Sequence, residues 1–157
     1  VLTLVGKLYL DTNIYNRPFD DQSAVRIRME TIAVFSILEM IRTGKLELVW
    51  SFILDYENSL NPYDDIRLEI EKLSFLASET VTADETIRTM GKTYELIGIK
   101  PRDALHLACA VKSGSNYFIT CDDQIVKKMS TQCLPLATMN PIHFVLETEE
   151  TYHETDD

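Results

Sequence analysis

The amino-acid sequence predicts an α/β fold in which a central parallel β-sheet is covered by helices on both faces. Short apolar runs of strand length alternate with longer segments of helical periodicity along the 157 residues, and this alternation is typical of βαβ units. Four segments place an acidic residue just after an apolar run or at an expected helix start. Because the carboxyl ends of parallel strands meet at one edge of a sheet, these acids can lie close together although they are distant in sequence.

A polar segment separates the first strand from the first helix. Residues 8–10 are apolar and predict a short strand, and residues 11–21 have the composition of a polar loop. A long helix is expected over residues 23–43, where apolar side chains recur near helical spacing, and Gly44 is placed to end it. The apolar residues expected at helical spacing are Ile27, Ile32, Phe35, Leu38 and Ile41.

The middle of the chain predicts two strands on either side of a pair of helices. Residues 46–50 predict the second strand, and residues 79–82 a third. Between them, residues 52–60 and 62–77 predict two helices that are separated at Pro62, because proline suits the first turn of a helix.

The last third of the chain repeats the alternation. Thr82 and Glu85 have the spacing of a capping box, so a helix is expected to begin there and to end near Gly98. The remaining expected elements are a helix at 101–112 ended by Gly114, a strand at 117–120, a helix at 122–130 and a strand at 134–137.

Length and composition indicate one globular domain, since 45% of the residues are hydrophobic and 25% are charged. The domain is expected to span residues 1–146, and the acidic residues at 147–157 to form a flexible, solvated tail. No apolar run approaches the ~20 residues of a membrane-spanning helix, and the first residues do not resemble a signal peptide, so a cytoplasmic protein is expected. The three cysteines show no Cys-x-x-Cys spacing, which favours reduced thiols over disulfides or a zinc site.

The formal net charge of −10 argues against an ordinary nucleic-acid-binding surface, because affinity for a phosphate backbone comes mainly from lysine and arginine. A metal-dependent nuclease remains compatible with this charge, since bound cations supply the local positive charge that the sequence lacks.

The acids of the four segments are Asp11, Glu57, Asp103 and Asp122. Mg²⁺ takes oxygen ligands and is usually held by one or two carboxylates, and acids without a histidine or cysteine partner favour Mg²⁺ or Mn²⁺ over zinc or copper. Each acid alone can also be read as a helix cap or a solvated helix residue, and Asp55 competes with Glu57. Their joint occurrence favours one metal site.

The sequence resembles the PIN-domain family, most closely the stand-alone bacterial branch that includes the VapC-type ribonuclease toxins. The resemblance lies in the motifs at residues 10–13, 51–57, 103–110 and 118–122, in their order and approximate spacing. It implies a three-layer α/β/α sandwich and a site for Mg²⁺ or Mn²⁺ at Asp11, Glu57, Asp103 and Asp122, which would act in the hydrolysis of RNA phosphodiester bonds. It also implies an antitoxin protein as a partner and, together with the abundance of amphipathic helix, a homodimer.

Several neighbouring residues are secondary candidates. Asn13 and Thr120 lie beside two of the acids and could position a water or a phosphate oxygen, and Asp123 could join or replace Asp122. His106 follows Asp103 by about one helical turn, but we expect it to be a satisfied core or interface histidine rather than a proton shuttle. The cations nearest the motifs, candidates for holding substrate phosphates, are Arg17, Arg102, Lys127 and Lys128.

Other classes fit the sequence less well. A receiver domain should show paired acids at the end of the first strand, where this chain has Asp11 alone, and a haloacid-dehalogenase-like phosphatase should show Asp-x-Asp, where this chain has Asn13. The alternative that stays open is a PIN-like domain that binds nucleic acid or a partner without cutting.

Overall fold

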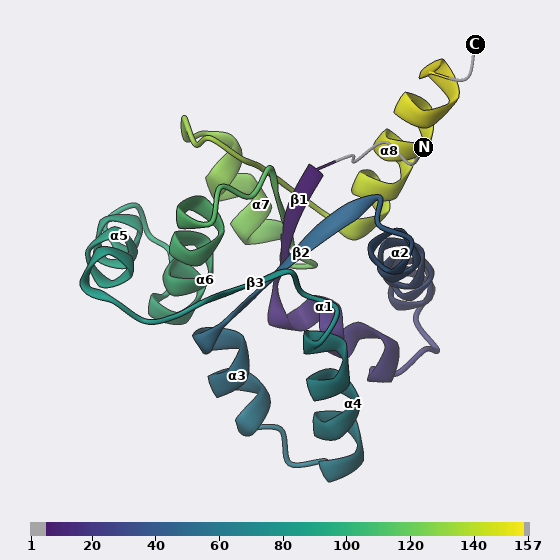
Figure 1. The fold of residues 1–157 in the computed structure, drawn as a ribbon, viewed down its shortest axis with the longest axis horizontal. Coiled ribbons are helices and arrows are strands. Elements are labelled where there is room, and N and C mark those ends of the chain that lie inside the picture. The colour runs from purple at the N-terminus through teal and green to yellow at the C-terminus, as the bar shows by residue number, and fades with distance from the viewer. Residues whose placement is uncertain (1–5, 156–157) are drawn as a thin grey trace.

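The computed structural model describes the backbone of residues 6–155 and the side chains of residues 6–149. Within this part of the chain, a parallel sheet with the strand order β3-β2-β1-β4-β5 forms the centre (Figure 1). The strands are β1 (Gly6–Leu10), β2 (Leu46–Ser51), β3 (Glu79–Val81), β4 (Tyr117–Ile119) and β5 (Ala137–Met139). The predicted parallel sheet is confirmed.

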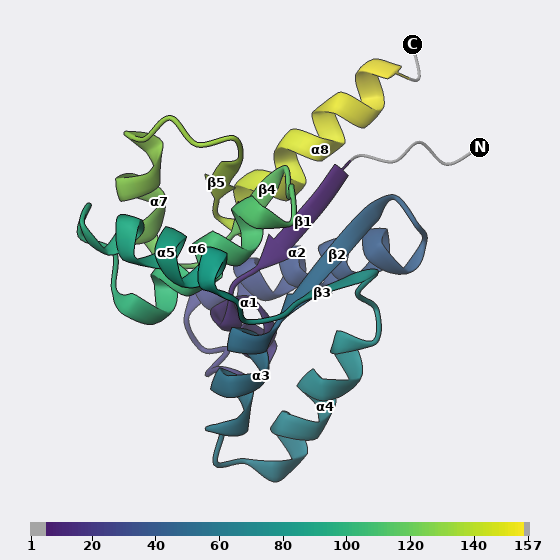
Figure 2. The ribbon, with the colours of Figure 1, turned by 60° about the vertical axis from the view of Figure 1, so that its left-hand side comes forward.

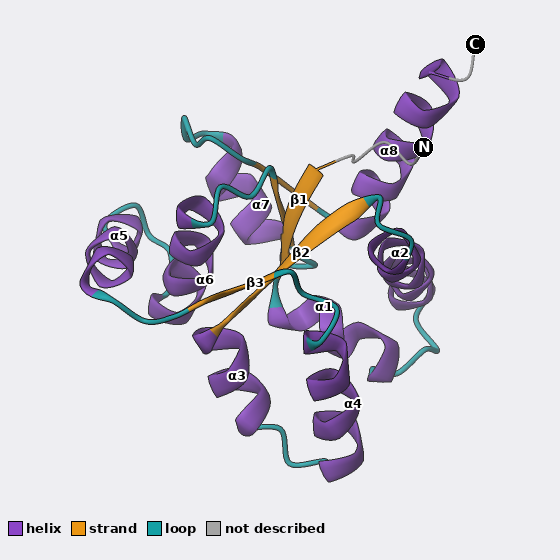
Figure 3. Cartoon of the chain, in the orientation of Figure 1, coloured by secondary structure: helices purple, strands orange, loops and turns teal. Residues whose placement is uncertain are grey.

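Helices cover both faces of this sheet. They are α1 (Thr12–Asn16), the 3₁₀ helix η1 (Arg17–Phe19), α2 (Val25–Arg42), α3 (Phe52–Ser59), α4 (Asp64–Ser74), α5 (Glu85–Glu95), α6 (Pro101–Lys112), α7 (Asp123–Ser130) and α8 (Pro141–Thr155). Helices α5, α6 and α7 lie on one side of the sheet and α2 and α8 on the other (Figures 1 and 2). Figure 3 shows the strands enclosed between these two layers, so the three-layer α/β/α architecture is also confirmed.

Strand β1 lies at the centre of the sheet and is buried on both faces. Leu8, Tyr9 and Leu10 are each 0% exposed, which is why the strand is apolar without alternation. The ring of Tyr9 stacks on that of Phe118 in β4, with centroids 5.6 Å apart. This stacking fixes β1 and β4 relative to each other, and polar residues follow the ends of both strands.

The strand order places a topological switch beside β1. The chain runs outward from β1 to β2 and β3, and then crosses back to β4 on the other side of β1. Ligands of α/β folds bind at such a switch, outside the carboxyl ends of the strands. Helices α3 and α4 extend beyond this end of the sheet (Figure 1).

The long helix α2 buries only part of the apolar set expected at helical spacing. Leu38 and Ile41 are buried as expected, but Ile32 and Phe35 are 69% and 56% exposed. Val34 and Ile37, which were not in the expected set, are buried in their place. The helix is apolar on two sides, so its periodicity predicts a helix but not which side meets the core.

Two local expectations about turns and strand ends were wrong. The segment expected as a polar loop at 11–21 contains α1 and η1, because Asp11 caps the first of them. The last strand lies at Ala137–Met139 rather than at 134–137, since Pro135 has no backbone N–H to give to a sheet.

The helix after Val81 is capped differently from the capping box expected at Thr82. Asp84 is the N-cap, and its side chain accepts a hydrogen bond from the backbone N–H of Ile87. The carboxylate of Asp84 thus caps the helix by accepting a backbone N–H that has no partner within the helix, as the capping box would have done.

The C-terminal segment also differs from expectation. Helix α8 runs across the boundary expected after residue 146 and continues the helical backbone to Thr155, beyond the start of the expected tail. Thr148 is buried, and its hydroxyl donates to the backbone carbonyl of Phe144. The described helices include none long and apolar enough to cross a membrane, and Cys109, Cys121 and Cys133 are free thiols.

A buried ion pair ties the segment after β1 to α2. Glu30 is 0% exposed, and its Oε1 lies 3.2 Å from Nε of Arg17 in η1. Its Oε2 accepts a hydrogen bond from Asn140, and Arg26 lies 3.5 Å away. Removing one partner of such a pair leaves a buried charge uncompensated, which is strongly destabilising.

We therefore expect Arg17→Met to destabilise the protein by about 3 kcal/mol, somewhat below the usual loss for a fully buried pair because Arg26 remains near Glu30. For a chain of this size that lowers the melting temperature by roughly 6–12 °C, measured by circular dichroism. The control is Arg88→Met, which removes an exposed arginine that is 3.7 Å from Glu85. Equal melting temperatures of the two variants would contradict this role of Arg17.

Candidate metal centre

Asp11 stands at the carboxyl end of β1 and is held by several hydrogen-bond donors. It is 5% exposed, and its Oδ1 accepts the backbone N–H of Thr12 at 2.8 Å. Its Oδ2 accepts the hydroxyl of Thr120 at 2.8 Å and the amide of Asn13 at 3.2 Å. The two polar residues expected near the site thus hold an acid in place. Asn13 also accepts the backbone N–H of Cys121, which joins the loops that follow β1 and β4.

Glu57 comes to the same place from α3, which begins directly after β2. Its Oε1 accepts the hydroxyl of Thr12 at 2.7 Å and contacts Nε2 of His106. One ligand atom from each of Asp11, Glu57 and His106 lies within 4.8 Å of the other two. Thr12 and His106 were not predicted as site residues, although one lies inside the Asp-Thr-Asn motif and the other one turn after Asp103.

Asp103 and Asp122 complete the acidic group from the first turn of α6 and the N-cap of α7. Asp122 uses Oδ1 to accept the backbone N–H groups of Gln124 and Ile125. No hydrogen bond to the carboxylate of Asp103 is found among the described residues, although that side chain is partly buried. The two acids line a hollow of about 270 Å³. The other lining residues are Ile99, Lys100, Gln124, Ile125 and Lys128.

The structure separates two of the secondary candidates from these acids. Asp123 forms a two-pronged ion pair with Arg26 of α2, with both N–O distances 2.7 Å, so it does not replace Asp122. Arg17 is engaged by Glu30.

The other candidate cations lie on α6 and α7. Nη1 of Arg102 lies 3.5 Å from Oε2 of Glu57. Lys128 lines the hollow and donates to the backbone carbonyl of Gly98, and Lys127 is exposed on α7.

The acids differ in how well their charges are compensated. Burial raises the pKa of Asp11, with His106 and Thr120 acting in the opposite direction. Burial and the nearby charge of Asp11 raise the pKa of Asp103. Burial alone would also raise the pKa of Glu57, but its interactions with His106 and Thr12 hold that pKa below its ordinary value.

A divalent cation fits this set of groups. Two like charges about 4 Å apart repel by roughly 4 kcal/mol at an effective dielectric constant near 20. Asp103 has neither a donor among the described residues nor an ion-pair partner there to offset that repulsion. Several carboxylate oxygens at one place are the donor set that Mg²⁺ and Mn²⁺ prefer.

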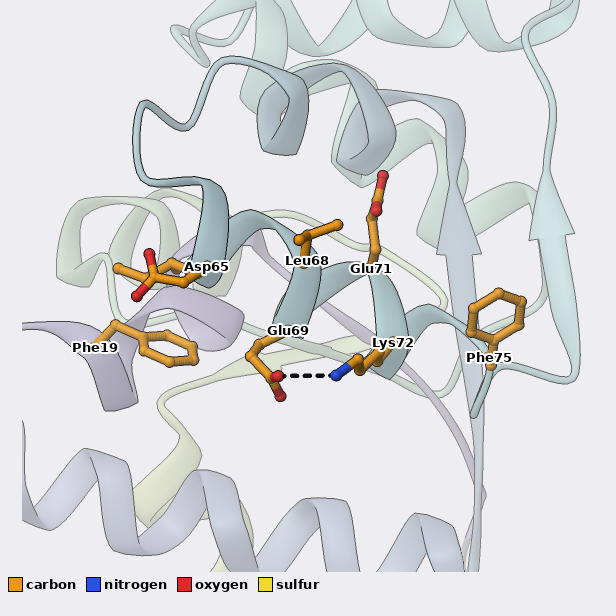
Figure 4. A pocket seen from close by; sticks show the side chains of 8 residues that line it. Phe19, Asp65, Leu68, Glu69, Glu71, Lys72 and Phe75 are labelled. Carbon is orange, nitrogen blue, oxygen red and sulfur yellow. Dashed lines mark hydrogen bonds and ion pairs between the residues drawn. The ribbon is translucent and has the colours of Figure 1, made fainter.

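A second hollow, of about 440 Å³, lies between η1 and α4 (Figure 4). Its apolar lining includes Phe19, Leu68 and Phe75, all of which are exposed. The remaining lining residues are Asp65, Ile66, Glu69, Glu71 and Lys72. This hollow is therefore an apolar surface with an acidic border, and it includes none of the four acids of the metal centre.

Comparisons with known proteins agree with the fold. The family model of the PIN domain matches residues 8–129, a span that includes all four acids. One similar solved structure is the crystal structure of VapBC2 from Rickettsia felis bound to a DNA fragment from their promoter. The likeness has a TM-score of 0.55 and 16% sequence identity, and it covers 85% of this chain and 98% of that chain. Among curated proteins, none matches the chain in sequence.

The raised pKa of Asp103 gives a prediction with a defined sign. The folded protein binds this proton more tightly than the unfolded chain, so the stability that the group contributes falls as pH rises from 3.8 through its raised value. In EDTA at pH 7, Asp103→Asn should melt at or above the wild type, by roughly 2–4 °C if about 1 kcal/mol of repulsion is relieved. The difference should close as pH falls below 3.8, where the wild-type carboxyl is also neutral.

The control for this measurement is Asp65→Asn. Asp65 is an exposed acid in the first turn of α4, so its variant loses only a favourable interaction with the helix dipole, about 0.3–1 kcal/mol, and should melt slightly lower. If Asp103→Asn melts lower in the same way, Asp103 is a helix-start acid and not a member of a repelling group.

Proposed function

Because the chain belongs to the PIN-domain family, we propose that it is a metal-dependent ribonuclease with its reacting centre at the carboxyl ends of β1 and β4. One observation supports this proposal: Asp11 and Glu57 lie together, the charges of Asp11, Asp122 and Glu57 act on Asp103, and Asp103 has no hydrogen-bond donor among the described residues. A structural role needs a partner for each buried carboxylate, whereas a cation site needs carboxylates that are free to bind.

In this proposal Asp11, Glu57, Asp103 and Asp122 hold Mg²⁺ or Mn²⁺. A bound divalent cation would lower the pKa of a water and stabilise charge on the attacking and leaving oxygens of a phosphodiester. The protein's own contribution is to keep the acids in place. Thr120 supports this by donating to Asp11 from a fully buried position.

Phosphate groups of the substrate would bind to the lysines around the hollow. Lys100 and Lys128 line it beside Asp103 and Asp122, and Arg102 lies next to Glu57. Each of these cations lies near an acid of the site, so the net positive charge that substrate phosphates meet would come mainly from the bound divalent cation. Arg17 is no part of this proposal, because Glu30 engages it.

We expect Asp11→Asn and Asp103→Asn each to lower Mn²⁺-dependent cleavage of single-stranded RNA by more than about 100-fold, since even the outer partners of a metal site are worth 10–100-fold. EDTA should stop the wild-type reaction. Asp123→Asn is the matched control, because it alters an acid next to Asp122 that is turned to Arg26, and it should keep the wild-type rate.

Two outcomes would contradict the ribonuclease proposal. Wild-type rates in either acid variant would mean that these acids are not the site. RNA binding by the wild type without cleavage would favour the alternative that the PIN domain binds without cutting.

We also propose that an antitoxin protein binds the apolar hollow between η1 and α4 (Figure 4). Phe75 is 87% exposed and Leu68 is 50% exposed, so a partner that covers them removes apolar surface from water. Glu69 of the border pairs with Lys72, so its uncompensated acidic charge comes from Asp65 and Glu71, which are complementary to basic residues. The expected partner segment is therefore apolar on one side and basic at its edges.

The partner proposal is tested with the protein encoded by the adjacent open reading frame, which should be a small DNA-binding protein. It should co-purify with the wild type after co-expression and be lost with Leu68→Glu or Phe75→Glu, while metal-dependent cleavage by these variants is retained. Leu96→Glu is the control, because Leu96 is an apolar side chain as exposed as Phe75, at 88% against 87%, but lies directly after α5. Retention of the partner by both hollow variants would place its binding elsewhere.

The homodimer stays a prediction. Helix α2 exposes a row of apolar side chains, Val25, Met29, Ile32 and Phe35, which the association of two copies would remove from water. Light scattering at micromolar concentration should give about twice 18.0 kDa. A particle of 18.0 kDa would contradict the prediction.

A further inference from the structure

His106 is a buried residue that joins the acidic site to the core. It is 0% exposed, and protein groups engage both of its ring nitrogens. Nε2 contacts Oε1 of Glu57, and Nδ1 lies 2.7 Å from the hydroxyl of Tyr9 in β1. The Tyr9 hydroxyl in turn lies 2.6 Å from Oγ of Ser51, which caps α3 by accepting the backbone N–H of Leu54.

Only one arrangement of protons satisfies this row of contacts with a neutral ring. The ionised carboxylate of Glu57 can only accept, so Nε2 of His106 must carry a proton and donate it. Nδ1 is then an acceptor, and the hydroxyl of Tyr9 must donate to it. The oxygen of Tyr9 remains free to accept the hydroxyl of Ser51, whose own oxygen accepts from the backbone of Leu54. Every donor is used, and the ring tautomer follows from the contacts.

The same contacts determine which oxygen of Glu57 can face a cation. Oε1 receives two donors, the hydroxyl of Thr12 and Nε2 of His106, and these occupy its two lone pairs. Oε2 has only the looser ion pair with Arg102, at 3.5 Å, and the side chain of Arg102 is half exposed and able to move. Hydrogen bonds to Oε1 therefore fix the position of the Glu57 carboxylate, and Oε2 is left able to bind a cation.

We propose that His106 is a positioning residue that holds Oε1 of Glu57 so that Oε2 binds the cation, with Tyr9 and Ser51 holding the histidine ring in its donating form. This inference rests on the proposed metal-dependent function, and it assigns His106 the role of a hydrogen-bond donor and not of a metal ligand. Partners of this kind orient metal ligands in many sites, and their loss costs about 10–100-fold in metal affinity or activity. Helix α3 carries Glu57 and is capped by Ser51, so both ends of the row of contacts lie on one element.

The test is Mn²⁺ binding to the full chain, measured by calorimetry without RNA. His106→Leu should weaken binding by about 10–100-fold. His106→Gln should restore most of the affinity, because its amide can donate near the position of Nε2. Tyr9→Phe, which leaves Glu57 and His106 in place, should weaken binding to a smaller extent, and it should add nothing to His106→Leu because both changes break one row of contacts.

The matched control is Tyr15→Phe. Tyr15 is also a buried tyrosine, but its hydroxyl has no hydrogen-bond partner among the described residues, so the variant should bind Mn²⁺ as the wild type does. Circular dichroism checks that each variant is folded, and Tyr9→Phe carries the test if His106→Leu does not fold.

Three results would overturn the inference alone. They are wild-type Mn²⁺ affinity in folded His106→Leu or Tyr9→Phe, additive losses in the double variant, and an electron spin echo signal from an imidazole nitrogen bound directly to Mn²⁺. Absence of Mn²⁺ binding by the wild type would overturn the proposed function itself, and the inference with it.

Discussion

The repulsion between carboxylates at the carboxyl ends of β1 and β4 is the constraint around which this protein is arranged. Asp11 is almost completely buried at the end of the central strand, where an isolated charge is costly. Its hydrogen bonds from Thr120 and Asn13 offset part of that cost and at the same time hold the two loops together. The groups that stabilise the acid are therefore the groups that shape the site.

The acids fall into two kinds by how they are compensated. Glu57 and Asp11 are held by hydrogen bonds from neutral groups, which fix their positions and support their ionised forms. Asp103 lacks such donors among the described residues and feels the charges of the other acids. The protein's own groups therefore hold Asp11 and Glu57 in place and leave the charge of Asp103 uncompensated by hydrogen bonds among the described residues. In the proposed function, a bound divalent cation would neutralise that charge.

The lysines and arginines near the site also fall into two groups, those in ion pairs within the fold and those that border the hollow. Arg17 and Arg26 lie near the buried Glu30 and join η1, α2 and α7, so their charge is used within the fold. Lys100 and Lys128 border the hollow beside Asp103 and Asp122, and Lys128 also donates to the backbone carbonyl of Gly98. Two lysines therefore offset the two acids of this hollow in a protein whose net charge is −10.

The sequence by itself determined the α/β class, the parallel sheet and the candidate acids, three of which follow strands or begin helices while Glu57 lies within α3. Apolar runs and helical spacing are local properties, and the end of a parallel strand leads to the same edge of the sheet wherever it occurs in the chain. These features need no knowledge of packing.

Only the tertiary structure decided which partner each side chain contacts when neighbouring residues in the sequence are chemically alike. Asp122 and Asp123 are neighbours in sequence, but one caps α7 beside Asp103 and the other turns to an arginine of α2. His106 differs from an ordinary core histidine only through the tyrosine and the glutamate that pack against its two nitrogens, residues that lie 97 and 49 positions away. Such contacts depend on how helices from distant segments pack on the sheet, and a local pattern carries no information about that packing.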